Sequence, residues 1–395
     1  MPIDLHVTEG TRVRASAALG KSVFLLVFLS VLTGFAFAST PSQRDWWYTL
    51  QRGQLMFIRG DYGNALLAFE DARRDRIAVI DRMERDLIDV LSLPEVRRLG
   101  DSLEWVERFI RERHFTAAAA ALDELFFRVP RESFGNSALA ALEELGNLRG
   151  FPEAEMWIGR TFLAGGELGI ALIQFERALA SRHLLENPAL ATDIMYQIAE
   201  IHRLRGEFHA MERVLHSILE DSVLWAGAGI GWQAGTFARD AMTRTLQSDG
   251  AERMIVLYRY GDTRVLRAHR ELGFHYAALG RHARAQEHLM FAFVIQNTVI
   301  IDEILRRRHD FTFTTLAALA GEIARDRMLS AYADETEYFR VAFYLANSLH
   351  GNGHPARARE LWGFLAERPD AGEWQARAAS QLRAPRVGAT LVLQP

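Results

Sequence analysis

A repeated arrangement of small and large residues around glycine turns constrains the fold of this chain most strongly. From about Asp45 to Leu382, amphipathic helical segments alternate with short turns, and strand-like alternation is almost absent. Gly60, Gly166 and Gly280 are each followed by alanine at +5, phenylalanine or leucine at +9, and alanine at +12. Small residues let two helix backbones approach, and the large residue fills the space beside them. The sequence therefore predicts antiparallel helix pairs that repeat along the chain.

The same frame recurs more weakly at Arg113, Gly206 and Gly353. With Leu272-Gly273 and Tyr276 before Gly280, it resembles the tetratricopeptide (TPR) family, which has Trp, Leu-Gly and Tyr on the first helix and Ala, Phe and Pro on the second. The resemblance implies an all-α, right-handed solenoid of antiparallel helix pairs.

The spacing of the turns departs from a regular array. The aligned positions 60, 113, 166, 206, 280 and 353 lie 53, 53, 40, 74 and 73 residues apart, whereas TPR repeats recur every ~34 residues. We therefore expect about six recognisable helix pairs and up to three degenerate ones. Additional helices are expected around residues 137–148, 236–246 and 312–324.

The N-terminus carries the features of an export signal. Residues 22–38 are uncharged and mostly apolar, follow Arg12, Arg14 and Lys21, and end in Ala36-Phe37-Ala38. This pattern predicts a signal peptide cleaved after Ala38. An uncleaved inner-membrane anchor stays open, because 17 residues are at the short end for a spanning helix. In either case the body is expected to be periplasmic or otherwise extracytoplasmic.

The three aromatic residues at positions 46–48 have two interpretations. Trp46, Trp47 and Tyr48 form either an aromatic belt beside an anchor or, as we prefer, part of the first packed helix. The expected organisation is a signal or anchor at 1–38, an N-terminal array at 39–220, an irregular glycine-rich joint at 221–262, a C-terminal array at 263–383 and a tail at 384–395.

Composition excludes several chemistries. The chain has no cysteine, and Lys21 is the only lysine among its 46 basic residues. Without residues 1–38 the chain therefore has no thiolate nucleophile, no Schiff-base lysine and no P-loop lysine. A net charge of -4 provides no field for nucleic acid.

Sequence motifs for catalysis, metals and cofactors are also absent, so we expect none of these. His269, His275, His282 and His288 cluster in one repeat, but none is four residues from another, and we interpret them as structural. The run Arg306-Arg307-Arg308 is interpreted as a solvated helix end.

For a TPR array, the resemblance implies a concave groove lined by the first helix of each pair. Its mixed apolar and arginine-bearing lining would suit apolar anchors and bidentate carboxylate contacts. The candidate groove residues are Leu50, Gln54, Phe57, Met156, Arg160, Leu163, Tyr196, Glu200, Arg203, Arg267, Arg270 and Phe274.

These features predict a non-enzymatic, exported scaffold that binds a protein or peptide partner in the cell envelope. One alternative is a ligand-binding accessory component of transport, which a closed apolar cavity would favour over an open polar groove. Others are a structural part of a flagellar or secretion assembly, and a glycan-acting enzyme with paired carboxylates or a Tyr–His pair in a deep cleft. Residues 22–38 are a candidate membrane tether, and the oligomeric state stays open.

Overall fold

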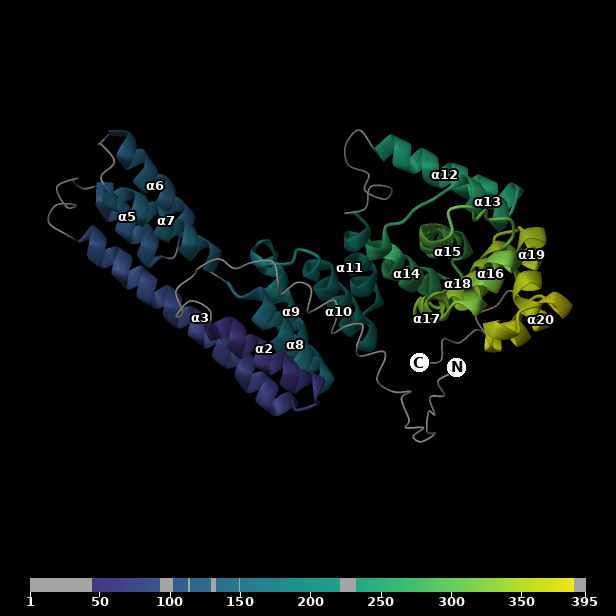
Figure 1. Cartoon of the computed structure of the whole chain (residues 1–395), viewed down its shortest axis with the longest axis horizontal. Helices are drawn as coiled ribbons and strands as arrows, with labels where there is room; N and C mark the ends of the chain where they lie inside the picture. Colours follow the sequence, from purple (N-terminus) through teal and green to yellow (C-terminus); the bar gives the residue numbers. More distant parts are fainter. Residues whose placement is uncertain are drawn as a thin grey trace, which may run out of the picture.

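The structure is a computed structural model that describes residues 45–92, 102–112, 114–128, 133–148, 150–220 and 232–386 (Figure 1). Within these ranges the chain forms eighteen α-helices and three short 3-10 helices, and no strand. The expectation of an all-α fold is therefore confirmed. The predicted signal segment and residues 387–395 of the predicted tail lie outside the described residues.

Six helix pairs are formed on either side of the turns that the sequence aligned, and one of these turn positions, Arg113, lies outside the described residues. At Gly60, Gly166, Gly206, Gly280 and Gly353 the backbone φ angle lies between 68° and 86°, a left-handed conformation that glycine adopts without a Cβ penalty. The pairs are α2 (Asp45–Ile58) with α3 (Tyr62–Leu91), α5 (Ser102–Arg111) with α6 (Phe115–Arg128), α8 (Pro152–Ala164) with α9 (Leu168–Ala180), α10 (Leu190–Leu204) with α11 (Phe208–Glu220), α14 (Leu266–Ala278) with α15 (His282–Arg307), and α18 (Tyr338–Gly351) with α19 (Pro355–Ala366).

The pairs of the three strongest copies also share a point of close approach, seven residues before the turn glycine. A Cβ atom built on Gly273 would lie 2.6 Å from the Leu289 side chain, and one on Gly159 would lie 3.1 Å from the Phe175 ring. At Gly53 the Phe69 ring leaves equally little room. Glycine in the first helix therefore allows the large residue of the second helix to pack against the backbone.

The remaining helices fill the long intervals between the aligned turns. The three expected additional helices are present as α7, α16 and α12, and residues 232–257, which the sequence placed in an irregular joint, are helical. The elements outside the six pairs are α7 (Ser133–Leu148), α12 (Trp232–Ser248), α13 (Ala251–Leu257), α16 (Leu316–Arg325), α17 (Arg327–Glu335) and α20 (Glu373–Arg383), with 3-10 helices at Arg182–Leu184, Thr263–Val265 and Pro369–Ala371.

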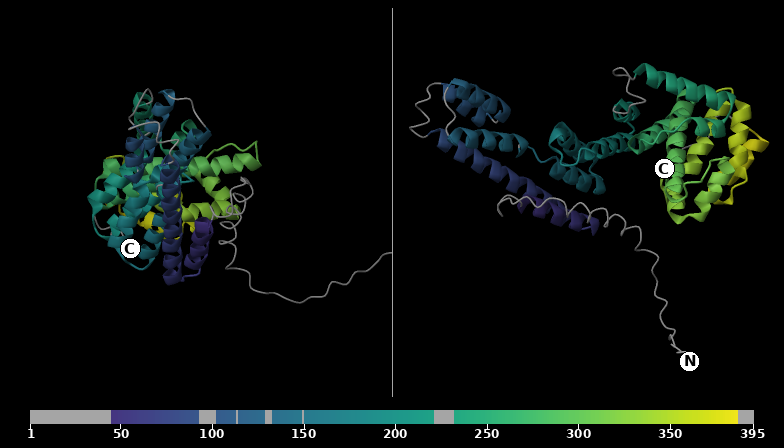
Figure 2. Two further views of the ribbon diagram at one scale, coloured as in Figure 1. Left: turned by 90° about the vertical axis from the view of Figure 1, so that its left-hand side faces the viewer. Right: turned by 45° about the horizontal axis from the view of Figure 1, so that its top comes forward.

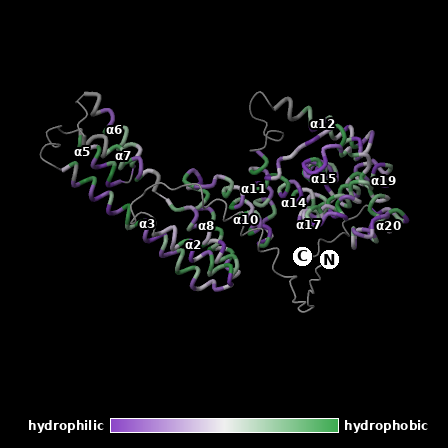
Figure 3. The backbone as a smooth tube through the Cα atoms, in the orientation of Figure 1, coloured by the Kyte–Doolittle hydropathy of each residue, from purple (hydrophilic) through white to green (hydrophobic). Residues whose placement is uncertain are grey.

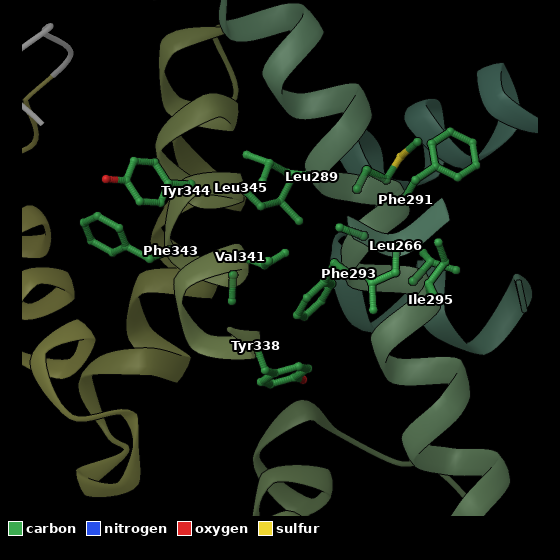
Figure 4. Packing of buried hydrophobic residues seen from close by; sticks show 14 of the residues in the cluster. Leu266, Leu289, Phe291, Phe293, Ile295, Tyr338, Val341, Phe343, Tyr344 and Leu345 are labelled. Atoms are coloured by element: carbon green, nitrogen blue, oxygen red, sulfur yellow. The ribbon is translucent and has the colours of Figure 1, made fainter. Parts of the chain in front are cut away.

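The largest hydrophobic core extends from α10 to α20, across the predicted joint. Helix α15 is its centre, and Phe293 on α15 stacks on Tyr338 of α18 with ring centroids 5.5 Å apart (Figure 4). Among the described helices, α15 alone is long and apolar enough to cross a membrane, and 78% of its most apolar window is buried inside the protein. We therefore interpret α15 as a core helix of this body.

The N-terminal half is built along α3, a helix of 30 residues. Its first half packs with α2 and α8 through Ala65, Phe69 and Ala72, and its second half packs with α5–α7 through Ile80 and Leu87. The result is an elongated arm, formed by α2, α3 and α5–α9. It projects from the more compact C-terminal body, formed by α10–α20 (Figures 1 and 2). Hydrophobic and hydrophilic residues alternate along these helices (Figure 3), as expected for elements buried on one face.

The junction between α3 and α8 contains a buried cation. Arg76 is 6% exposed and lies over the rings of Phe151 and Trp46, at 4.6 and 5.9 Å from the ring centroids. Burial lowers its pKa, and the nearby carboxylates of Glu153 and Glu186 oppose that shift. The arginine thus links the first helix pair to the pair formed by α8 and α9 through stacking and charge. Trp46 itself is buried, so its ring belongs to the first packed helix.

Candidate functional site

Several of the predicted groove residues are packing residues in this structure. Leu50, Met156, Tyr196 and Phe274 are between 1% and 7% exposed, because each lies between helices of adjacent pairs. This burial corrects the expectation that these four side chains are open to a partner.

Three further candidates are partly buried or engaged within the array. Phe57 contacts the Trp157 ring at 5.5 Å between centroids, and Leu163 packs against the core formed by α8–α10. Gln54 is half-buried on α2. These residues join neighbouring helices and do not form one continuous lining.

The predicted groove arginines already have partners. Arg203 pairs with Glu200 at 2.6 Å, Arg267 with Glu271 at 2.5 Å, and Arg270 with Glu337 at 3.2 Å. The fourth, Arg160, lies over the Trp157 ring at 4.7 Å, and burial lowers its pKa. A partner carboxylate would therefore have to replace an existing contact at the three ion-paired positions.

Arg270 and Phe274 lie beside a cavity between α17, α18 and α20. This cavity has a volume of ≈ 510 Å³ and is formed by the end of α17, the first turns of α18 and the segment leading into α20. Six of its lining residues are charged, four of them acidic. The lining residues are Ala333, Asp334, Glu337, Tyr338, Phe339, Arg340, Tyr344, Asp370, Ala371, Gly372, Glu373, Trp374 and Arg377.

Aromatic and guanidinium groups are layered along one wall of the cavity. Arg377 on α20 lies over the Trp374 ring at 4.7 Å and pairs with Glu373 at 2.7 Å. The Trp374 ring in turn meets Tyr344 of α18 at 6.0 Å between centroids. This wall presents flat apolar surface with charged groups at its edge, the composition of a protein-binding hot spot.

The opposite part of the cavity is organised by Glu337. This residue precedes α18 with φ 55° and ψ 43°, and it is the one residue other than glycine with positive φ among the described residues. Its carboxylate binds two arginines, Arg340 at 2.5 Å and Arg270 at 3.2 Å. Arg340 also lies 4.3 Å from the centroid of the Phe274 ring, and its Nε is buried without a hydrogen-bond acceptor. Such strained backbone is often found where a binding surface must be held in place.

A second cavity, of ≈ 220 Å³, lies where α15, α16 and α17 meet. Arg307 there pairs with Glu303 and Asp326, and Arg308 pairs with Glu322 at 2.6 Å. The arginine run that the sequence indicated as a solvated helix end therefore connects three helices. This arrangement braces the helix junction.

Two of the four histidines noted in the sequence come together in the core. His269 and His288 are 0% and 2% exposed, with their Nδ1 atoms 3.2 Å apart. His216 of α11 lies beside them, and its Nε2 is 3.1 Å from the Tyr276 hydroxyl. Among the described residues, no group of three histidines or acids has the geometry to hold a metal ion.

The Tyr276–His216 pair bears on the enzyme alternative, which required such a pair in a deep cleft. Tyr276 is 1% exposed, and neither residue lines the 510 Å³ or the 220 Å³ cavity. His275 is bound by Glu212 at 2.8 Å on the neighbouring helix. These contacts join α11 to α14 and hold the pair within the helix packing.

None of the residues predicted from the sequence lines the 510 Å³ cavity, although one signal was available. Arg340 precedes Gly353 by 13 residues, the same offset that selects Arg267 before Gly280. No comparable signal exists for Trp374 and Arg377, because α20 lies after the last aligned pair.

Comparisons with known proteins identify a similar protein, but its name gives no activity. No family model matches the chain. An uncharacterized protein of Treponema pallidum (strain Nichols) is 26% identical over 339 residues, which cover 86% of this chain and 90% of the relative. The similarity therefore extends over both the arm and the C-terminal body.

Proposed function

We propose that this chain is an exported, non-enzymatic scaffold of TPR-like helix pairs that binds a protein partner in the cell envelope. The observation that carries the proposal is the shared geometry of the pairs: left-handed glycines at five aligned turns, with a close helix approach seven residues before three of them. Stacked helix pairs of this kind present extended surfaces to partners. The export expectation depends on residues 22–38 of the sequence.

The cavity between α17, α18 and α20 is the proposed docking site. Its six charged lining residues and its aromatic wall favour a protein surface over an apolar small molecule, which would require a mainly apolar lining. The wall is also preorganised, because Arg377 and Trp374 are held by Glu373 and Tyr344 before any partner arrives. Preorganised side chains lose less conformational entropy on binding.

The chain offers a matched pair of surfaces with which to test this site. Trp105 and Arg108 on α5 form the same tryptophan–arginine contact at the same three-residue spacing as Trp374 and Arg377, at 4.6 Å instead of 4.7 Å. Tagged wild type, W374A/R377A and W105A/R108A would be recovered from cells, and the proteins recovered with each would be quantified by mass spectrometry.

The proposal expects a partner that is depleted with W374A/R377A and retained with W105A/R108A. Loss of two hot-spot side chains costs ~2 kcal/mol or more of binding free energy, which reduces affinity at least ~30-fold. Equal recovery of every protein with all three chains would refute the assignment of the site. Turnover of a glycan substrate by the wild type, abolished in W374A/R377A, would instead support the enzyme alternative.

A further inference from the structure

The outer face of α2 combines apolar and basic side chains. Six exposed residues, five on α2 and one directly after its end, share this face at 3, 4, 7, 10 and 11 positions after the first, and at about 100° per residue they occupy an arc of roughly 120°. The residues are Tyr48, Gln51, Arg52, Leu55, Ile58 and Arg59.

The apolar members of this face are unusually exposed for their size. Tyr48, Leu55 and Ile58 are 74%, 53% and 66% exposed, while Trp46 and Leu50 on the opposite face are buried against α3 and α8. One side of α2 thus packs into the hydrophobic core, and the other side exposes a second strip of apolar residues to solvent. Exposed apolar strips of this kind mark sites of interaction with a partner or a membrane.

The two arginines favour a membrane over a protein as the binding partner of this face. Neither Arg52 nor Arg59 forms an ion pair with a described residue, whereas Arg74 on α3 pairs with Asp71 at 2.9 Å. Both arginines lie along one edge of the apolar strip, where long basic side chains can reach anionic groups while their methylene stems cover apolar surface. A surface helix with this division of residues is typical of binding at a lipid interface.

The position of α2 in the sequence supports a lipid surface. Six residues, 39–44, separate the uncharged segment 22–38 from Asp45. Six extended residues span at most about 20 Å. Whenever residues 22–38 enter a membrane, the first turn of α2 must therefore lie within about 20 Å of its surface.

We propose that the outer face of α2 binds an anionic lipid surface, with Tyr48, Leu55 and Ile58 in the headgroup region and Arg52 and Arg59 on lipid phosphates. The helix has 14 residues and would lie along the interface for about 21 Å. This contact is separate from the cavity near α20 and does not depend on the function proposed for it.

The absence of cysteine makes a direct test available, because one introduced cysteine can be labelled uniquely. The full chain would carry an environment-sensitive nitrobenzoxadiazole label at L55C, with I173C on α9 as control, since Ile173 is 50% exposed. Each would be mixed with vesicles of phosphatidylcholine and phosphatidylglycerol. The inference expects a shift to shorter emission wavelength and quenching by brominated lipid at position 55, and neither change at position 173.

Removal of the two positive charges on this face supplies the second arm of the test. With R52Q/R59Q, the shift at position 55 should decrease and lose its dependence on phosphatidylglycerol. An unshifted label at position 55 in the presence of vesicles would overturn the proposal. A shift that appears without vesicles and grows with protein concentration would also overturn it, in favour of a second copy of the chain on this face.

Discussion

Acid should destabilise the C-terminal body through the buried histidines between α14 and α15. Burial lowers the pKa of His269 from 6.5 to about 3, and burial also lowers the pKa of His288 well below its ordinary value. The His269 imidazole is therefore neutral in the folded state at pH 5, whereas in the unfolded chain it binds a proton below pH ~6.5. Because the unfolded state then holds more protons, stability is highest above this value and falls as the pH decreases towards 3.

The size of the effect follows from the shift of His269. Below pH 6.5 each pH unit lowers the free energy of unfolding by ~1.4 kcal/mol, so ~2 kcal/mol are lost between pH 7.5 and 5 through this residue. His288 acts in the same direction. The substitution His269→Asn removes the titrating ring and keeps a hydrogen-bonding group near Nδ1. It should lower stability at pH 7.5 but reduce the further loss at pH 5 by ~2 kcal/mol.

Hydrogen exchange provides the assay, because amides of α14 and α15 report the opening of this body without interference from the arm. Opening free energies would be obtained at pH 7.5 and 5 after correction for intrinsic exchange rates. The reasoning is refuted if wild type and His269→Asn lose the same stability between the two pH values.

Two further substitutions and one control test the packing. Gly273→Ala places a Cβ atom 2.6 Å from Leu289 and should destabilise the body by ~1–3 kcal/mol, whereas Gly63→Ala meets no atom within 4 Å and should be neutral or slightly stabilising in the same chemical denaturation measurement. Arg76→Met leaves the buried Glu153 without its neighbouring cation and should cost ~3 kcal/mol or more, measured as faster exchange of amides in α3 and α8; exchange equal to wild type would contradict the role given to Arg76.

The helix pairs could be predicted from sequence because their determinants are local. A glycine that must adopt positive φ and an alanine or phenylalanine at a fixed offset leave a readable pattern within about 20 residues, as at Gly166 and Phe175. The helices within residues 232–257 were harder to predict from the sequence, because glycines nearby suggested an irregular joint. The structure shows that α12 and α13 contribute Met242 and Met254 to a core shared with distant helices. Tertiary packing decided the outcome there.

The cavity and the histidine cluster could not be predicted for a related reason. Trp374 and Tyr344 meet because α20 folds back on α18, and His269 meets His288 because two helices of one pair bring positions 19 residues apart into contact. Such convergence depends on helix orientation, which spacing within one helix does not specify. Three of the four predicted groove arginines are not free in this structure, because acidic neighbours such as Glu271 and Glu337 already bind them.

Site-specific photocrosslinking in intact cells tests the central claim most directly. A photoreactive amino acid would replace Asp334, which is exposed and lines the cavity, or Glu104, which is exposed beside Trp105 on the arm. The proposed function predicts a discrete crosslinked protein from position 334, absent from position 104 and lost when Arg340 is also replaced by alanine. Crosslinks that are identical at both positions, or that occur at position 104 alone, would contradict a docking site between α17, α18 and α20.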